Sequence, residues 1–340
     1  MQLQVTHDTR YDYTPAVSVA QHIAYLQPLT TSRQQLLGHR MVVTPEPAQQ
    51  LISTDIYGNT RLFFALQNAH TQLQVTASSI VSTQAPDPSP SVISWEAVRN
   101  HLQYSAREPF DAAAEFVFAS PLAPRHVDFS AFAQASLAPG RPLLHVARDL
   151  MQRIHRELAY ESHSTQVNTP ALQALDQRKG VCQDFAHIMV ACLRSLGLPA
   201  RYVSGYLLTQ PAPGQTRLIG NDASHAWAAV YLPDLDSVAP SERWHDFDPT
   251  NNRDGWGGPG EDYVTLAVGR DFGDVSPIRG VIHGGAHHTL TVGVTVEPYG
   301  VYDANGFGIL NPSQSQSQSQ SQSGSQAQSQ SQSQSQSQTP

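Results

Sequence analysis

The chain has 340 residues, of which about 300 have a composition suited to folding, enough for two domains and a sizeable core. A formal net charge of −8 with only 20 basic residues argues against nucleic acid as a partner. The sequence contains no run of about 18 apolar residues, the length needed to cross a membrane, and its first residues lack the basic and apolar regions of a signal peptide. With only two cysteines, we therefore expect a cytoplasmic protein without a disulfide scaffold.

The first part of the chain, residues 1–85, predicts a β-rich domain. Short alternating segments such as 2–6 and 72–76 are typical of strands, and turn residues such as 57–59 lie between them. A break with prolines at positions 86, 88 and 90 follows, and it marks a natural domain boundary.

The second part, residues 90–300, predicts a core of helices and strands. One expected helix has an apolar face formed by Leu143, Val146, Leu150, Ile154 and Leu158. A second is expected over 182–196, because its apolar residues recur at intervals of three and four. We expect the first helix to pack behind the second.

The expected helix over 182–196 begins with a cysteine, Cys182. The first turn of a helix has unpaired backbone N–H groups and the positive end of the helix dipole, which together stabilise a thiolate. Cys182 is therefore a candidate nucleophile, whereas Cys192 is typical of a small buried apolar residue. Asp184 and His187 are close in sequence, but their fixed helical offset favours capping or orienting the helix.

A cysteine nucleophile needs a base and a group that orients the base. Residues 224–232 predict a strand that begins near His225, and residues 243–251 predict a second strand that ends in an acidic turn. Two adjacent antiparallel strands can hold His225 beside an aspartate. Asp248 is the candidate, and Asp246 stays an alternative because it lies two residues away on the same strand face.

Two segments near the C-terminus invite other interpretations. His283, His287 and His288 lack recognised metal-ligand spacing, so we expect a glycine turn before a strand over 289–296 and no metal site. The sequence contains no glycine-rich phosphate loop and no dinucleotide-binding fingerprint, so we expect no cofactor. The Ser/Gln tail, residues 311–340, has almost nothing apolar to bury and is expected to be disordered.

Three motifs resemble those of the transglutaminase-like superfamily, in the bacterial branch assigned to cysteine proteases. They are residues 180–187 (GVCQDFAH), 224–227 (SHAW) and 247–251 (FDPTN). Residues near the N-terminus also resemble the N-terminal domain of that branch; they are His7, Thr9, Tyr11, Tyr13, Asp55, Gly58 and Asn59. Residues 269–271 (GRD) and 274–277 (DVSP) resemble the segment that follows its core.

The resemblance implies an α+β fold in which a papain/transglutaminase-like core packs the cysteine helix on an antiparallel sheet. It also implies a catalytic triad of Cys182, His225 and Asp248. The expected chemistry is attack on an amide bond of a peptide or protein through a thioester, with hydrolysis favoured over transfer to an amine. A silent binding module on the same fold and a metal-dependent hydrolase are the alternatives.

Overall fold

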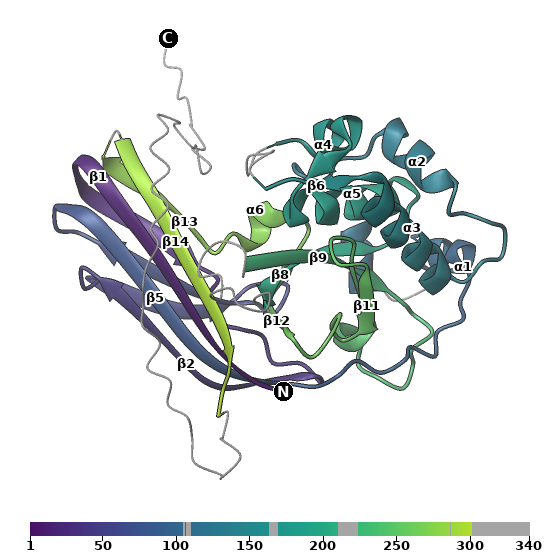
Figure 1. The fold of residues 1–340 in the computed structure, drawn as a ribbon, viewed down its shortest axis with the longest axis horizontal. Helices are drawn as coiled ribbons and strands as arrows, with labels where there is room; N and C mark the ends of the chain where they lie inside the picture. The colour runs from purple at the N-terminus through teal and green to yellow at the C-terminus, as the bar shows by residue number, and fades with distance from the viewer. Residues whose placement is uncertain (105, 107–109, 163–168, 210–223, 286, 301–340) are drawn as a thin grey trace, which may run out of the picture.

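The computed structural model describes residues 1–104, 106, 110–162, 169–209, 224–285 and 287–300. The Ser/Gln tail predicted at 311–340 lies outside these residues. Figure 1 shows two parts side by side, a large curled antiparallel sheet and a smaller sheet covered by helices. This arrangement confirms the predicted α+β class.

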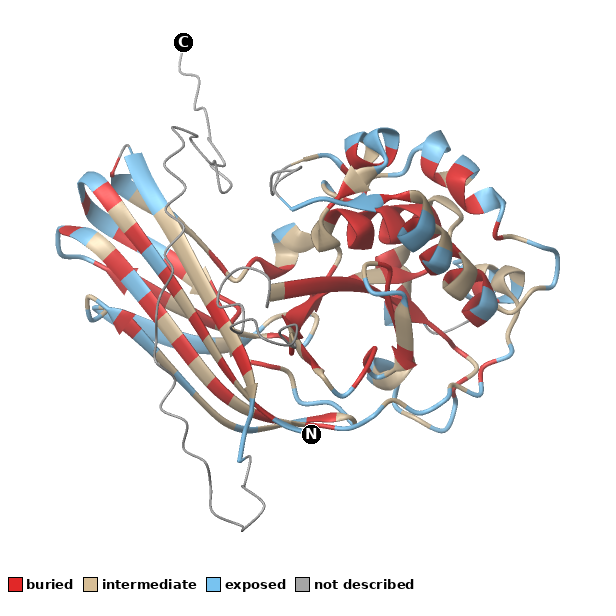
Figure 2. Cartoon of the chain, viewed as in Figure 1, coloured by how far each residue is buried: buried red, intermediate tan, exposed pale blue. Residues whose placement is uncertain are grey.

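The large sheet has seven strands and contains both ends of the described chain. Its strands are β1 (Gln2–Ala24), β2 (Gln34–Thr44), β3 (Gln49–Thr54), β4 (Thr60–Leu66), β5 (His70–Thr83), β13 (Ile278–Gly284) and β14 (His287–Pro298). The long strand β1 is the centre, since β4, β5, β13 and β14 all pair with it antiparallel. Buried residues alternate with more exposed ones along much of β1 and along β5, as expected for a sheet with one face in the core (Figure 2).

The last two strands differ from the sequence prediction, which placed residues 90–300 together as the core with its C-terminal strands. Strand β14 pairs with β1 from Leu3↔Pro298 to Thr14↔His287. Side chains of β14 such as Val294 and Val296 complete an apolar cluster there with Leu3 and other residues. The C-terminal strands thus belong to the N-terminal sheet, where they pair with β1 and share its apolar cluster.

The second part of the fold holds the helices and the smaller sheet. Its helices are α1 (Trp95–His101), η1 (Ala112–Val117), α2 (Val127–Gln134), α3 (Leu143–Glu157), α4 (Ala171–Gln177), α5 (Cys182–Ser195), η3 (Pro240–Glu242) and α6 (Phe272–Val275). A short parallel pair joins β6 (Ala159–Tyr160) to β7 (Lys179–Gly180). None of the helices in the described residues is long and apolar enough to span a membrane.

The smaller sheet has five antiparallel strands in the order β11-β10-β9-β8-β12. They are β8 (Ala200–Leu207), β9 (Ser224–Tyr231), β10 (Trp244–Asp248), β11 (Arg253–Trp256) and β12 (Tyr263–Gly269). Strand β9 is buried along nearly its whole length (Figure 2), since α5 covers one face of it and the other face packs in an apolar cluster with η1. The predicted antiparallel pairing of β9 with β10 is confirmed.

Helix α5 is more deeply buried than its apolar periodicity predicts. Every residue from 184 to 194 is buried, because α2, α3, α4 and the strands β8 and β9 surround the helix. The predicted packing of α3 against α5 is confirmed. The buried guanidinium of Arg194 is satisfied by backbone carbonyls of Phe116, Ala200 and Arg270 and by the hydroxyl of Ser120.

Two side-chain amides join the N-terminal part to β12, the edge strand of the smaller sheet. Gln34 donates to the carbonyl of Thr265 and accepts its N–H, both at 2.7 Å. Asn59 does the same at Val268, at 2.7 and 2.8 Å. These carboxamides supply the hydrogen bonds that a neighbouring strand would otherwise make.

Candidate active site

Cys182 is the first residue of α5, and its side chain is half-buried. Asp184 fixes this turn, since its carboxylate accepts the N–H of Val181 at 2.8 Å. The turn also needs glycine at 180, where a Cβ would lie 2.7 Å from the side chain of Asp184. The cysteine therefore sits at the helix end whose dipole favours negative charge.

His225 and Asp248 come from the neighbouring strands β9 and β10. The Nε2 atom of His225 lies 2.7 Å from Oδ2 of Asp248, and both side chains are buried. The thiol of Cys182 lies near enough to the imidazole to contribute to the raised pKa of His225. The structure thus brings together the three residues that the sequence singled out.

The electrostatics of this pair favour an imidazolium next to a carboxylate. Burial lowers the pKa of His225, but the charge of Asp248 and the hydrogen bonds of Asp248 and Cys182 outweigh burial and raise it to about 10. Burial likewise raises the pKa of Asp248, yet His225 and the hydrogen bonds from Tyr263 and Asn251 hold it below its usual range.

Asp248 receives several hydrogen bonds besides that of His225. Its Oδ2 accepts the Tyr263 hydroxyl and the Asn251 side-chain N–H, each at 2.7 Å. Its Oδ1 accepts the backbone N–H groups of Thr250 and Asn251 at 2.9 and 3.3 Å. A fully buried carboxylate with this many donors is held in one orientation.

Asp246, the alternative orienting residue, has a different contact. Its Oδ1 accepts the indole N–H of Trp227 at 2.7 Å. The ring of Trp227 in turn stacks on His225, with ring centroids 6.2 Å apart. Asp246 therefore supports the aromatic neighbour of His225, and the carboxylate that bonds the imidazole is Asp248.

His187 lies behind the first turn of α5 and away from solvent. Its Nε2 accepts the backbone N–H of Phe272 at 3.1 Å, and its ring stacks on Tyr202 with centroids 4.7 Å apart. Burial lowers the pKa of His187 to about 4 despite the nearby charge of Asp271, so the ring is neutral at ordinary pH. These contacts join α5 to β8 and α6, in line with the expected orienting role.

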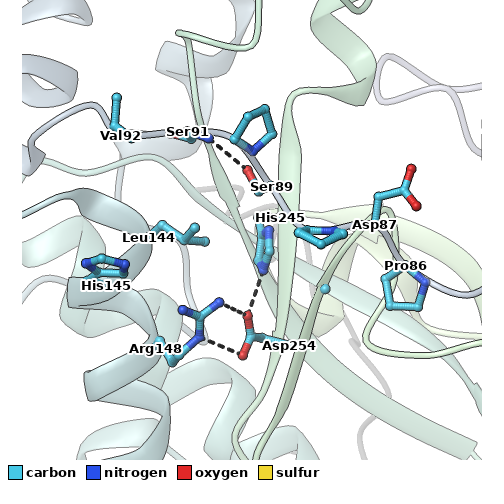
Figure 3. Close-up of a pocket in the computed structure, with 13 residues that line it drawn as sticks. Pro86, Asp87, Ser89, Ser91, Val92, Leu144, His145, Arg148, His245 and Asp254 are labelled. Atoms are coloured by element: carbon cyan, nitrogen blue, oxygen red, sulfur yellow. Dashed lines mark hydrogen bonds and ion pairs between the residues drawn. The ribbon is translucent and has the colours of Figure 1, made fainter.

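A second polar group lines a cavity of about 560 Å³ between α3, β10, β11 and residues 86–92. Figure 3 shows Arg148 and His245 both pointing at Asp254. Arg148 donates two hydrogen bonds to this carboxylate, at 2.9 and 2.7 Å, and His245 Nε2 lies 2.8 Å from it. Because successive strand residues face opposite sides, His245 lies on the other face of the sheet from Asp248.

The C-terminal histidines lie on strands of the large sheet. His283 is in β13, and His287 and His288 are in β14 after the turn at Gly284 and Gly285, which both have positive φ. The ring of His288 packs near Tyr11 and Tyr13, at centroid distances of 5.9 and 6.2 Å. The predicted glycine turn and following strand are confirmed.

Sequence reasoning missed the supporting residues of Asp248. Asn251 has a local signal, since a polar residue three positions after an aspartate in a turn can bond back to it. Tyr263 has none, because it lies on β12, two strands away from β9 in the sheet order.

Two family models match the chain. The transglutaminase-like superfamily matches residues 130–249, a range that includes Cys182, His225 and Asp248. The bacterial transglutaminase-like N-terminal region matches residues 3–82. The chain belongs to the transglutaminase-like superfamily.

Relatives and solved structures agree with this assignment. An uncharacterized protein of Mycobacterium tuberculosis is 38% identical over 304 residues, covering 87% of this chain and 92% of the relative. One of Mycobacterium leprae is 30% identical, covering 86% and 98%. A crystal structure from Cytophaga hutchinsonii, described as a "Putative Cysteine Protease", shares the fold, with a TM-score of 0.64 and 21% identity over 90% of this chain and 93% of that chain.

Proposed function

We propose that this protein is a cysteine enzyme that hydrolyses amide bonds of peptides or proteins through a thioester on Cys182. The observation that carries the proposal is the 2.7 Å contact between His225 and Asp248 beside the thiol at the start of α5. Since Asp248 engages Nε2 of His225, Nδ1 is the ring nitrogen left to exchange a proton with the thiol.

The reaction follows from these roles. The thiol proton of Cys182 lies on Nδ1 of His225 before the reaction, and the thiolate sulfur attacks the amide carbon. The backbone N–H of Cys182 stabilises the oxyanion, because the first N–H groups of a helix have no intrahelical acceptor. The carbon–nitrogen bond then breaks, the imidazolium protonates the leaving amine, and a thioester remains.

Water completes the cycle in this proposal. His225 takes a proton from the attacking water, the carbon–sulfur bond breaks, and the pair of thiolate and imidazolium is restored. An amine in place of water would give acyl transfer instead. Lys179 is the single lysine of the chain, so the protein itself offers almost no amine for such a transfer.

A substrate screen tests the proposal. Peptide amides, glutamine-containing peptides with a fluorescent primary amine, and cell-wall amides are incubated with the wild type, Cys182→Ala and Cys192→Ala. We expect turnover by the wild type and by Cys192→Ala, whose thiol is buried within α5, and none by Cys182→Ala. Product that contains the amine would identify a transferase, and equal turnover by Cys182→Ala would overturn the thiol mechanism.

Inhibitors separate the alternatives. Iodoacetamide is expected to abolish the activity, and a chelator is expected to leave it unchanged. Loss of activity with the chelator alone would instead indicate a metal-dependent hydrolase. Absence of turnover on all three substrate classes, with Cys182 unreactive, would favour a binding module.

A further inference from the structure

Three donors meet at one oxygen of Asp248. Oδ2 of this carboxylate lies 2.7 Å from His225 Nε2, from the hydroxyl of Tyr263 and from the side-chain nitrogen of Asn251. Asn251 follows Asp248 in the same turn, but Tyr263 is brought from a distant edge of the sheet. Its hydroxyl is therefore the donor whose presence needs a separate explanation.

The sheet makes room for Tyr263 to reach Asp248. Strand β8 separates β12 from β9, and the residue of β8 that pairs with His225 is Gly205. A Cβ at this position would lie 2.2 Å from the carbonyl oxygen of Val264 and 2.4 Å from the ring of Trp227. The missing side chain lets the Tyr263 ring pack edge-on against Trp227, with centroids 5.5 Å apart.

We propose that Tyr263 is a positioning residue of the candidate site, whose hydroxyl holds Asp248 and limits the negative charge that this carboxylate presents to His225. The inference rests on the proposed function. A carboxylate that shares its charge among several donors attracts the imidazolium less strongly than one bound by the imidazole alone. Because the imidazolium must give its proton to the leaving amine, a weaker attraction makes it a better acid.

The test measures the protonation of His225 directly and needs no substrate. In a Cys182→Ala background, which removes the neighbouring thiol, the ring signals of His225 are followed by NMR between pH 5 and 12 and assigned with His225→Gln. This assignment is required because the chain has 15 histidines. Tyr263→Phe is compared with Tyr206→Phe, a control that loses a buried hydroxyl of β8 bonded to His7.

We expect Tyr263→Phe to move the midpoint of the His225 titration upward by about 1 pH unit, the effect of losing one hydrogen bond to a charged group. Tyr206→Phe should leave the midpoint unchanged, while both variants keep a cooperative melting transition. An unchanged or lowered midpoint in Tyr263→Phe, or an equal shift in Tyr206→Phe, would overturn the role of Tyr263.

The same titration separates this inference from the proposed function. If His225 in the Cys182→Ala reference titrates at or below about 6.5, the ordinary histidine value, its pairing with Asp248 is too weak for the proposed chemistry. If the reference titrates higher and Tyr263→Phe does not move it, only the inference about Tyr263 fails.

Discussion

His225 and Asp248 form a buried pair in which Nε2 and Oδ2 lie 2.7 Å apart, with exposed side-chain fractions of 6% and 0%. Two such groups are stable in the core because each satisfies the other and because Tyr263, Asn251 and the backbone of residues 250 and 251 donate hydrogen bonds to the carboxylate. This pair fixes the imidazole ring and leaves its second nitrogen for the thiol.

The pair predicts a particular pH dependence of stability. Because the pKa of His225 is raised from 6.5 to about 10 in the folded protein, its stabilising contribution is complete below pH 6.5 and is lost as the pH rises through about 10. The melting temperature of the wild type should therefore exceed that of Asp248→Asn by the largest margin near pH 6. This difference should be smaller at pH 10. A margin that grows with pH would contradict the assignment of the proton to His225.

The amide bridge between Asn59 and β12 predicts a structural effect. Asn59→Ala removes a fully buried side chain and leaves the backbone N–H and carbonyl of Val268 without its two hydrogen bonds. We expect a loss of about 3 kcal/mol of unfolding free energy, measured by urea titration. Asn68→Ala, at an exposed position, is the control and should change it by less than about 0.5 kcal/mol. A similar small effect in both variants would show that the bridge contributes little.

Truncation tests the interpretation of the Ser/Gln tail as a segment without a folding or catalytic role. Between 313 and 338 the only apolar residue is Ala327, so the segment has almost nothing to bury. A chain ending at residue 311 should match the full chain in melting temperature and in the alkylation rate of Cys182. A clear loss in either quantity would mean that the tail docks on the folded part or acts in the site.

The candidate site could be predicted largely from the sequence because its residues stand in local patterns. The helix start at Cys182 and the pairing of the strands that carry His225 and Asp248 follow from periodicity and turn residues. The choice between Asp246 and Asp248 did not follow, since both lie on one face of β10. It depends on where β10 ends relative to the start of β9, which only the assembled sheet fixes.

Other features depend on contacts between distant segments. The sequence gives no sign that Tyr263 bonds Asp248, since the two residues lie on β12 and β10, with β8 and β9 between them in the sheet. Arg194, a basic residue near the end of a helix, reads as a solvent-exposed cap, yet it is fully buried among carbonyls. The pairing of β14 with β1 joins residues nearly 300 positions apart, and alternation within each strand cannot specify that partner.

The central claim is that Cys182 and His225 act together, and the pH dependence of Cys182 alkylation tests it most directly. Iodoacetamide is applied from pH 5 to 10 to the wild type and His225→Ala, with the modified cysteine identified by peptide mass and buried Cys192 as the internal control. We expect fast modification of wild-type Cys182 well below pH 8.5, where an ordinary thiol is still protonated, and a shift toward about 8.5 in His225→Ala. Modification that rises only near pH 8.5 in both proteins would contradict the account.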